Sequence, residues 1–193
     1  MKITTIPILS DNYSYLIVDK DNKSCSAVDP ASPEEIIPFL EKEKLDLKNI
    51  LNTHYHSDHT AGNLELKEKY KCKIYGPDKE KDQIPGIDIT LKENDTLKIN
   101  DYSVKIFETP GHTAGHIIYW FDKEKVVFTG DTLFVLGCGK LFEGTPEIMW
   151  NSLLKIRNLP KETKIYCGHE YTRSNADFAL TIEKNNDKLI KRS

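Results

Sequence analysis

The 193-residue sequence lacks any long hydrophobic run, and its longest apolar stretches fall far short of the roughly 20 residues that a membrane-spanning helix needs. It begins without an apolar secretory core or an Arg- and Ser-rich leader, so we expect a cytoplasmic protein with no membrane contact. Positive charge is not in excess, because 27 Lys and Arg face 30 Asp and Glu and leave a net charge of −3. This balance argues against a nucleic-acid partner.

Cysteine is scarce and scattered. The four cysteines, Cys25, Cys72, Cys138 and Cys167, lie far apart and form no C-x-x-C pair. This spacing excludes the disulfide framework of a small secreted domain and indicates reduced thiols, one or two of them in the core. No Gly-, Ser- or Pro-rich linker divides the chain, and its length suits one domain with a short appendage.

Short strands dominate the elements that the apolar pattern predicts. Ser32 followed by Pro33 marks the start of a helix that runs to about residue 44. We expect strands over 3–8, 13–19, 25–29, 49–53, 73–75, 96–99, 102–109, 116–121, 125–129 and 164–167, a polar turn at 20–22, and further helices near 64–71, 146–158 and from about 173. Strands followed by a helix and a strand occur twice, which predicts two sheets covered by helices in a four-layer α/β arrangement.

Three of the six histidines fall within six residues, in the segment T-H-Y-H-S-D-H. If 49–53 is a buried strand, His54 and His56 follow it in an extended stretch, where side chains two residues apart point to one side and can share a metal ion. Asp58 and His59 come as the chain turns into the next helix, so they can face the same point. The alternative is a polar loop with accidental histidines, but this pattern after an apolar strand favours a metal site.

Three further donors follow predicted strands in the same way. His112, Asp131 and His169 each come directly after a glycine just beyond a strand end, where enzymes on sheet scaffolds collect their chemistry. Seven donors exceed one tetrahedral ion, so we expect two divalent ions about 3.5 to 4 Å apart with a shared water. We assign His54, His56 and His112 to the first ion, Asp58, His59 and His169 to the second, and Asp131 to both. The sixth histidine, His116, is expected to hydrogen-bond to a ligand instead.

These residues resemble the metallo-β-lactamase superfamily, whose T-H-x-H-x-D-H motif begins at Thr53. Within it the sequence is similar to glyoxalase II, the hydroxyacylglutathione hydrolases, over nearly the whole chain. The segments that carry this similarity are 9–13, 109–116, 128–134, 137–145 and 166–172. Segments 137–145 and 166–172 are the ones that narrow the match from the superfamily to glyoxalase II. The resemblance implies an αββα sandwich of the metallo-β-lactamase type over residues 1–172, with metal ligands at the positions already assigned.

The resemblance also implies a substrate and the residues that bind it. The small-molecule substrate would be S-D-lactoylglutathione or another S-2-hydroxyacylglutathione, cleaved to a 2-hydroxy acid and glutathione in methylglyoxal detoxification. Lys140 matches the basic residue that pairs with a glutathione carboxylate, Phe142 lies beside it in the pocket wall, and Tyr171 matches a residue whose hydroxyl contacts the glutathione backbone. Without the resemblance, Lys140 is one of many surface lysines and Tyr171 a half-buried aromatic.

The mechanism that we expect is hydrolysis by a metal-bridging hydroxide. Two ions would lower the pKa of the bridging water to about 7, and the hydroxide would attack the thioester carbonyl, oriented by Asp58 as catalytic carboxylate. A thiolate leaving group with a pKa of about 8.5 needs no dedicated general acid. The nitrogen and oxygen donors suit zinc, and also iron or manganese.

One departure from the family affects substrate binding. The family's chain continues into a helical domain with further cationic residues, whereas this sequence ends at Ser193. We therefore expect 173–193 to be the start of a truncated C-terminal helical region, and a monomer with intact metal chemistry but weakened binding of a substrate held mainly by Lys140. The alternatives are another thioester, a lactam, a phosphodiester or a persulfide as substrate, or an inactive metal-binding form.

Overall fold

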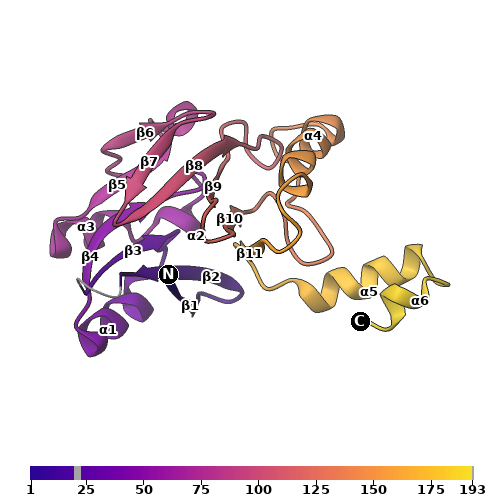
Figure 1. Cartoon of the computed structure of the whole chain (residues 1–193), viewed down its shortest axis with the longest axis horizontal. Coiled ribbons are helices and arrows are strands. Elements are labelled where there is room, and N and C mark those ends of the chain that lie inside the picture. Colours follow the sequence, from indigo (N-terminus) through magenta and orange to yellow (C-terminus); the bar gives the residue numbers. More distant parts are fainter. Residues whose placement is uncertain (20–22, 193) are drawn as a thin grey trace.

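Two β-sheets lie face to face at the centre of the computed structural model, which describes residues 1–19 and 23–192 (Figure 1). The first sheet has the order β1-β2-β3-β4-β5-β6 and the second β11-β10-β9-β8-β7. The strands are β1 (Lys2–Ile8), β2 (Asn12–Val18), β3 (Ser24–Val28), β4 (Asp46–Leu51), β5 (Lys73–Pro77), β6 (Ile89–Leu91), β7 (Thr96–Ile99), β8 (Tyr102–Glu108), β9 (Ile117–Phe121), β10 (Val126–Gly130) and β11 (Lys164–Cys167). The helices are α1 (Pro33–Glu43), α2 (Ser57–Thr60), α3 (Asn63–Tyr70), the 3-10 helix η1 (Asp78–Glu80), α4 (Pro146–Arg157), α5 (Thr172–Ile182) and α6 (Asp187–Ile190).

Central strands such as β2, β9 and β10 are buried on both faces because each sheet packs against the other sheet on one side and against helices on the other. In β2, Tyr15 and Ile17 point into the core between the sheets, whereas Leu16 and Val18 pack against the outer core that includes Leu40 of α1. Each such side chain, fully buried, contributes about 1.5 to 3 kcal/mol relative to leaving it in water. The outer helices α1 and α3 therefore hold the first sheet from one side.

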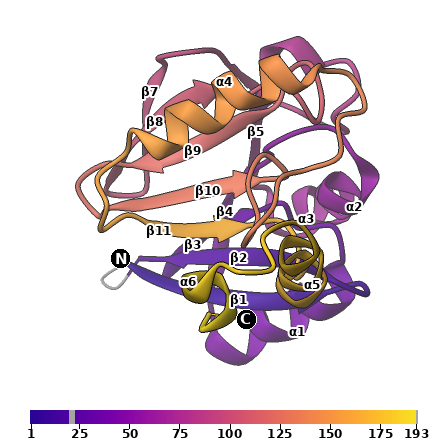
Figure 2. The ribbon, with the colours of Figure 1, turned by 90° about the vertical axis from the view of Figure 1, so that its right-hand side faces the viewer.

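The second sheet alternates in the same way. In β9, Tyr119 and Phe121 face the first sheet, while Ile118 and Trp120 pack outward in a small core that includes Ile156 of α4. Figure 2 shows α4 lying across the outer face of this sheet. The four layers are thus helix, sheet, sheet and helix, which confirms the predicted αββα sandwich.

Because several strands run in the same direction, the loops that follow them lie at one end of the sandwich. In the first sheet, β3 and β4 run parallel. In the second sheet, β10 and β11 run parallel, and β8 has the same direction because it is antiparallel to β9, which is antiparallel to β10. Loops after parallel strands leave a sheet at the same edge. The loops after β8, β10 and β11 therefore lie together.

Several local predictions need correction. Ser32 is the N-cap of α1, as predicted, but its hydroxyl contacts the carboxylates of Glu34 and Glu35 and accepts no hydrogen bond from the helix backbone. The strand expected over 49–53 begins earlier, at Asp46, because Asp46 pairs with Ser24 of β3. The short elements α2, η1, β6 and α6 were not predicted, and the predicted turn at 20–22 lies outside the described residues.

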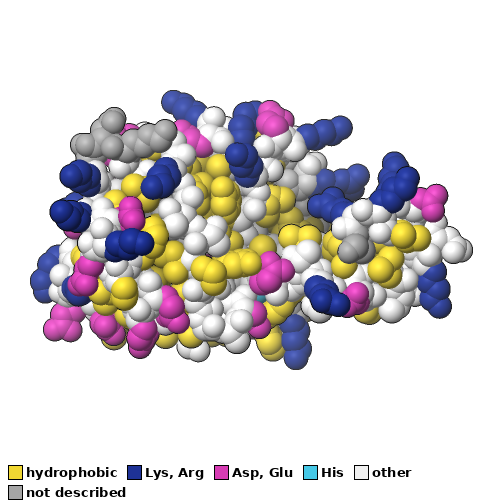
Figure 3. Space-filling model, turned by 90° about the horizontal axis from the view of Figure 1, so that it is seen from below, with side chains coloured by type: hydrophobic (Ala, Val, Ile, Leu, Met, Phe, Trp, Pro, Cys, Tyr) yellow, Lys and Arg dark blue, Asp and Glu magenta, His cyan; other side chains and the backbone are white. Residues whose placement is uncertain are grey.

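Helices α5 and α6 project from the sandwich as an arm (Figure 1). Phe178, Ile182 and Ile190 on this arm are half or more exposed, and hydrophobic side chains lie open on it in Figure 3. Over the described parts of the chain, the helices are all too short or too polar to cross a bilayer.

Candidate metal centre

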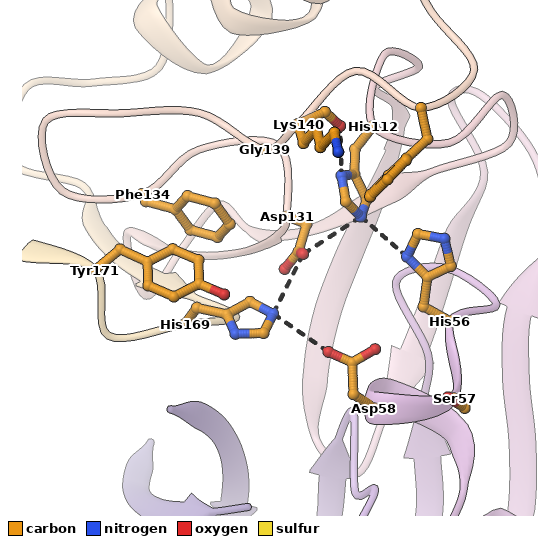
Figure 4. A pocket seen from close by; sticks show the side chains of 11 residues that line it. His56, Ser57, Asp58, His112, Asp131, Phe134, Gly139, Lys140, His169 and Tyr171 are labelled. Atoms are coloured by element: carbon orange, nitrogen blue, oxygen red, sulfur yellow. Dashed lines mark hydrogen bonds and ion pairs between the residues drawn. The ribbon is translucent and has the colours of Figure 1, made fainter. Parts of the chain in front are cut away.

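The seven predicted ligands meet at the end of the sandwich where the parallel strands finish. His54 and His56 follow β4, and the short helix α2 carries Asp58 and His59. His112 follows β8, and in the same way Asp131 follows β10 and His169 follows β11. Figure 4 shows His56, Asp58, His112, Asp131 and His169 directed toward one centre.

The donor atoms form two clusters that share a carboxylate. The first cluster is His54, His56 and His112, and the second is Asp58, His59 and His169; in each, the donor atoms lie within 4.8 Å of one another. Asp131 lies between them, with its Oδ1 3.4 Å from His59 Nε2 and its Oδ2 3.4 Å from His112 Nε2 and 3.3 Å from His169 Nε2. A third group within the same distance limit, His54, His59 and Asp131, joins the two clusters through the shared carboxylate. The division of these ligands between two ions is taken up as a proposal below.

Proton positions in the first cluster follow from its hydrogen bonds. The Thr53 hydroxyl donates its proton to Asp29 Oδ2 at 2.7 Å, so it accepts from His54 Nδ1 at 3.0 Å. The only remaining nitrogen of this imidazole, Nε2, therefore carries a lone pair. It lies 3.0 Å from His56 Nδ1.

The hydrogen bonds of His112 fix the position of its ring proton in the same way. Its Nδ1 donates to the Lys140 carbonyl at 2.7 Å, which leaves a lone pair on Nε2, 3.0 Å from His56 Nδ1. Two lone pairs thus converge on one further ring nitrogen. A cation can accept these two lone pairs together with one on His56 Nδ1, and partners on the far side of a ring orient ligating histidines in this way.

The second cluster also fits a cation. His169 donates from Nδ1 to Asp11 Oδ1 at 2.9 Å, and His59 Nδ1 lies 3.1 Å from Asp29 Oδ2. The Nε2 atoms of both rings therefore face the carboxylates of Asp58 and Asp131. Among the described groups, the buried His59 Nε2 and Asp131 Oδ1 have no hydrogen-bond partner, which is the pattern of an ion site rather than of a finished polar core.

The pKa shifts suit metal binding in the first cluster. Burial, together with neighbouring histidines, lowers the pKa of His54 well below its usual value, and burial also lowers the pKa of His56 and His112. Burial alone would raise the pKa of Asp131, but His59 and the other histidines hold it well below its usual range. Neutral imidazoles beside an ionised carboxylate are the protonation states that ligate a divalent ion. In the second cluster, burial works to lower the pKa of His59, but Asp131 and Asp29 raise it to about 9, and Asp131 likewise raises the pKa of His169, so an ion bound there would displace protons from these rings.

His116 has the supporting position that we expected. Its ring is fully buried, and Nε2 accepts from the backbone N–H of Asp131 at 3.1 Å. Nδ1 lies 3.1 Å from the hydroxyls of both Thr109 and Thr132, and the ring stacks on His54 at 4.9 Å. Burial lowers its pKa to about 3, so this histidine stays neutral while it positions Asp131.

A cavity of about 470 Å³ opens directly onto the clusters. Its lining includes Lys140, Phe142 and Tyr171, the three residues expected to bind substrate, together with Phe134. Lys140 Nζ lies 4.9 Å from the centre of the Phe142 ring, and Tyr171 stacks on His169 with the rings 4.9 Å apart and nearly parallel. The cavity therefore has a polar floor of metal donors and a wall with one cation and three aromatic rings.

Comparison with known proteins identifies the family. The family model described as "Metallo-beta-lactamase superfamily" matches residues 9–169. A hydroxyacylglutathione hydrolase of Pelagibacter ubique is 51% identical over 189 residues, covering 98% of this chain and 79% of that protein. One from Methylococcus capsulatus is 45% identical over 192 residues, covering 100% and 75%. This chain belongs to the metallo-beta-lactamase superfamily and, within it, to the family of the hydroxyacylglutathione hydrolases.

Solved structures share the fold of this hydrolase. The structure titled BLEG-1 B3 metallo-beta-lactamase has a TM-score of 0.81 at 28% identity, covering 88% of this chain and 92% of its own. The structure of ETHE1 from Myxococcus xanthus has a TM-score of 0.78, also at 28% identity, covering 89% and 76%. The four-layer sandwich is therefore that of the metallo-β-lactamase fold, and its donor set is positioned for divalent metal.

Sequence reasoning assigned no role to the residues of this hydrolase that hold the ligands in place. Asn12, the first residue of β2, donates from Nδ2 to Asp58 Oδ2 at 3.0 Å, and its neighbour Asp11 orients His169. Asp29 is buried and orients both His59 and Thr53. The position of Asp29 was an available clue, because it directly follows a buried strand as the ligands do.

We expect Asp29→Asn to lower the affinity of the hydrolase for zinc about 10- to 100-fold, because one carboxylate oxygen that faces Thr53 or His59 becomes an amide donor. Competition with a chromophoric chelator measures this affinity. Asp101→Asn, an exposed carboxylate beyond β7, is the control and should bind zinc as the parent does. Parent-like zinc affinity in Asp29→Asn would show that the carboxylate does not support the cluster.

Proposed function

We propose that this hydrolase cleaves the thioester of an S-2-hydroxyacylglutathione, such as S-D-lactoylglutathione, to a 2-hydroxy acid and glutathione. The observation that carries the proposal is the single cavity that joins both donor clusters to Lys140, Phe142 and Tyr171. A carbonyl above the clusters and a peptide-like carboxylate near Lys140 can occupy this cavity together. The names of the relatives at 45% to 51% identity support the same substrate.

We propose two zinc ions as the resident metals, with iron or manganese as alternatives. The residues that would hold them are His54, His56 and His112 for one ion, Asp58, His59 and His169 for the other, and Asp131 for both. When bound, such ions supply the Lewis acidity that activates water and polarises a carbonyl. The mixed nitrogen and oxygen donors are within the range that all three metals accept.

Asp58 is the catalytic carboxylate in this proposal. It lines the cavity, and Asn12 holds its Oδ2 by a hydrogen bond of 3.0 Å. Burial works to raise the pKa of Asp58, but His59 and the Asn12 hydrogen bond lower it overall, so the carboxylate is ionised. An ionised, fixed acceptor at the cavity floor can hold the proton of the attacking water and direct its oxygen toward the carbonyl carbon.

The leaving group requires little from the chain. Attack of water on the carbonyl breaks the carbon–sulfur bond, and the electron pair leaves on sulfur as a thiolate. Since a thiol has a pKa of about 8.5, the thiolate departs without a proton donor and takes one up from solvent afterwards. The mechanism therefore assigns no general acid to the cavity wall.

Substrate binding in this proposal depends on Lys140, whose Nζ would pair with a glutathione carboxylate. Phe142 would pack beside it, and the Tyr171 hydroxyl would contact the glutathione backbone. We expect Lys140→Ala to raise KM about tenfold with kcat within about twofold, because a charge-assisted hydrogen bond is lost without any change at the clusters. Steady-state kinetics measures the split. Lys98→Ala, which changes an exposed side chain of β7, serves as control, and an unchanged KM in Lys140→Ala would contradict the assignment.

A parallel assay tests the proposed function. The purified chain is loaded with zinc, manganese or iron, and loss of the thioester of S-D-lactoylglutathione is followed beside a β-lactam and a phosphodiester. We expect metal-dependent cleavage of the thioester that exceeds the other two substrates. Preferred cleavage of the lactam or the phosphodiester, or full metal loading without any hydrolysis, would contradict the proposal.

We also propose that residues 1–172 form the catalytic domain, with 173–193 the start of a helical region, and that the protein acts as a cytoplasmic monomer on a small molecule. The arm formed by α5 and α6, which begins at Thr172, supports the boundary. All four cysteines are free, with Cys25 and Cys72 buried, as suits a reducing compartment.

A further inference from the structure

Glu80 is a buried carboxylate that lies outside both donor clusters. It ends η1 in the lysine-rich segment 79–81, yet only 3% of its surface is exposed. No ion pair is found for it among the described residues, although an unpaired buried charge is costly. Burial raises the pKa of Glu80 overall, against the hydrogen bonds that favour its charged form. Such a group requires a structural reason for its position.

The hydrogen bonds of Glu80 supply that reason. Its Oε2 accepts from the backbone N–H of Tyr55 at 2.8 Å. Its Oε1 accepts from the Thr113 hydroxyl at 2.5 Å and from the backbone N–H of Gly115 at 2.9 Å. All three partners are donors, so the carboxylate acts as acceptor only.

These contacts join the two loops that carry the first cluster. Tyr55 lies between His54 and His56, and Thr113 directly follows His112. One carboxylate thus fixes the backbone of the loop after β4 to that of the loop after β8, beside all three donors. A rigid support of this kind determines how well ligands keep the geometry that a metal requires.

The packing at Gly115 shows how closely Glu80 is fitted. A Cβ atom at this position would lie 2.7 Å from Glu80 Cγ and 2.9 Å from Lys79 Cβ. No side chain larger than a hydrogen atom fits there without displacing Glu80. The loop after β8 is therefore built around this carboxylate.

We propose that Glu80 is a positioning residue that holds the first ion site, and not the second. The second cluster has supports of its own in Asp11 and Asn12, Asp29 supports both clusters through His59 and Thr53, and Glu80 accepts no hydrogen bond from any of these residues. Loss of Glu80 therefore loosens His54, His56 and His112 relative to one another and leaves the other donors in place. This inference rests on the proposed function with two metal ions, but the experiment that tests it measures the metal content of the protein.

Two variants of Glu80 test separately the length of its side chain and its ability to accept three hydrogen bonds. Glu80→Gln keeps the length of the side chain but turns one oxygen into an amide donor, which meets N–H groups that have nothing to accept it. Glu80→Asp keeps the charge but is one methylene too short to reach both loops. We expect both to lose about 10- to 100-fold in affinity for one of two zinc ions, so that at a chosen chelator concentration they retain about one ion per chain where the parent retains two.

Matched controls distinguish positioning from a general loss of stability. Asp88→Asn removes a carboxylate that likewise accepts from a backbone N–H, that of Ile74 at 2.8 Å, in the first sheet away from the site. It should lower the melting temperature while retaining two ions. Glu143→Gln changes an exposed carboxylate that spans the same two loops, through Tyr55 and Ala114, and should lose less than threefold in affinity.

The test of the role of Glu80 is the zinc content at a fixed chelator concentration. It is measured by elemental analysis, together with the melting temperature. One retained ion in both Glu80 variants, with kcat reduced and KM within about twofold, supports the proposal. Two ions held with the parent's affinity, or equal weakening of both ions, overturns it. The metal measurement does not require turnover, so a parent that fails to cleave glutathione thioesters would refute the proposed function and leave this test intact.

Discussion

Replacing Asp131 with alanine is expected to abolish turnover and metal binding together, with kcat lowered by about 10³-fold or more. Both oxygens of this carboxylate face donors, Oδ1 toward His59 and Oδ2 toward His112 and His169. Its removal therefore weakens both clusters at once. Elemental analysis after gel filtration and kinetics on S-D-lactoylglutathione measure the two effects on one preparation.

Two further variants provide comparisons for the Asp131→Ala result. His59→Ala should show the same combined loss, because His59 Nε2 belongs to the second cluster and faces Asp131. Asp101→Ala, an exposed carboxylate in the turn between β7 and β8, should retain metal and activity. Full activity in Asp131→Ala or in His59→Ala, with circular dichroism showing a folded chain, would contradict the shared two-ion arrangement.

Removal of metal by a chelator is expected to lower the melting temperature by about 8 to 16 °C for each ion lost. A ligand present at about a thousand times its dissociation constant stabilises the folded state by about 4 kcal/mol, and in a chain of this size 1 kcal/mol moves the melting temperature by about 2 to 4 °C. The structural reason is that the lone pairs of His54 and His112 converge on His56 Nδ1, an arrangement in which one cation can accept all three nitrogens.

Thermal melting of the chelated and zinc-restored protein measures this effect. Zinc should restore the melting temperature and the activity. Magnesium should restore neither, because it prefers oxygen donors, and three of the four ligands assigned to the first ion are imidazole nitrogens. Equal melting temperatures with and without zinc would show that the clusters are stable polar networks instead of ion sites.

The layers of the fold could be predicted from the sequence because apolar periodicity and burial agree. In β9 every residue is apolar and buried, which is typical of a strand covered on both faces. Shorter elements were missed for a physical reason. The three residues of β6 are a strand only because they pair with β5, and α2 is a single turn that no periodicity can indicate.

The metal-ligating residues of the candidate site could be predicted because they are histidines and aspartates that follow the ends of strands. His112, Asp131 and His169 were expected together because each follows a strand, and in the structure Asp131 Oδ2 lies 3.4 Å from His112 Nε2 and 3.3 Å from His169 Nε2. The supporting residues follow no such rule. Glu80 lies between two lysines and has the sequence pattern of a surface residue, and its burial depends on Tyr55 and Gly115 from distant loops.

Anomalous diffraction from crystals of the zinc-loaded protein, recorded on both sides of the zinc edge, tests the central claim most directly. The account predicts two zinc peaks about 3.5 to 4 Å apart. One should lie among His54, His56 and His112, the other among Asp58, His59 and His169, with Asp131 between them. A single peak, or zinc bound elsewhere while these side chains keep their mutual hydrogen bonds, would contradict it.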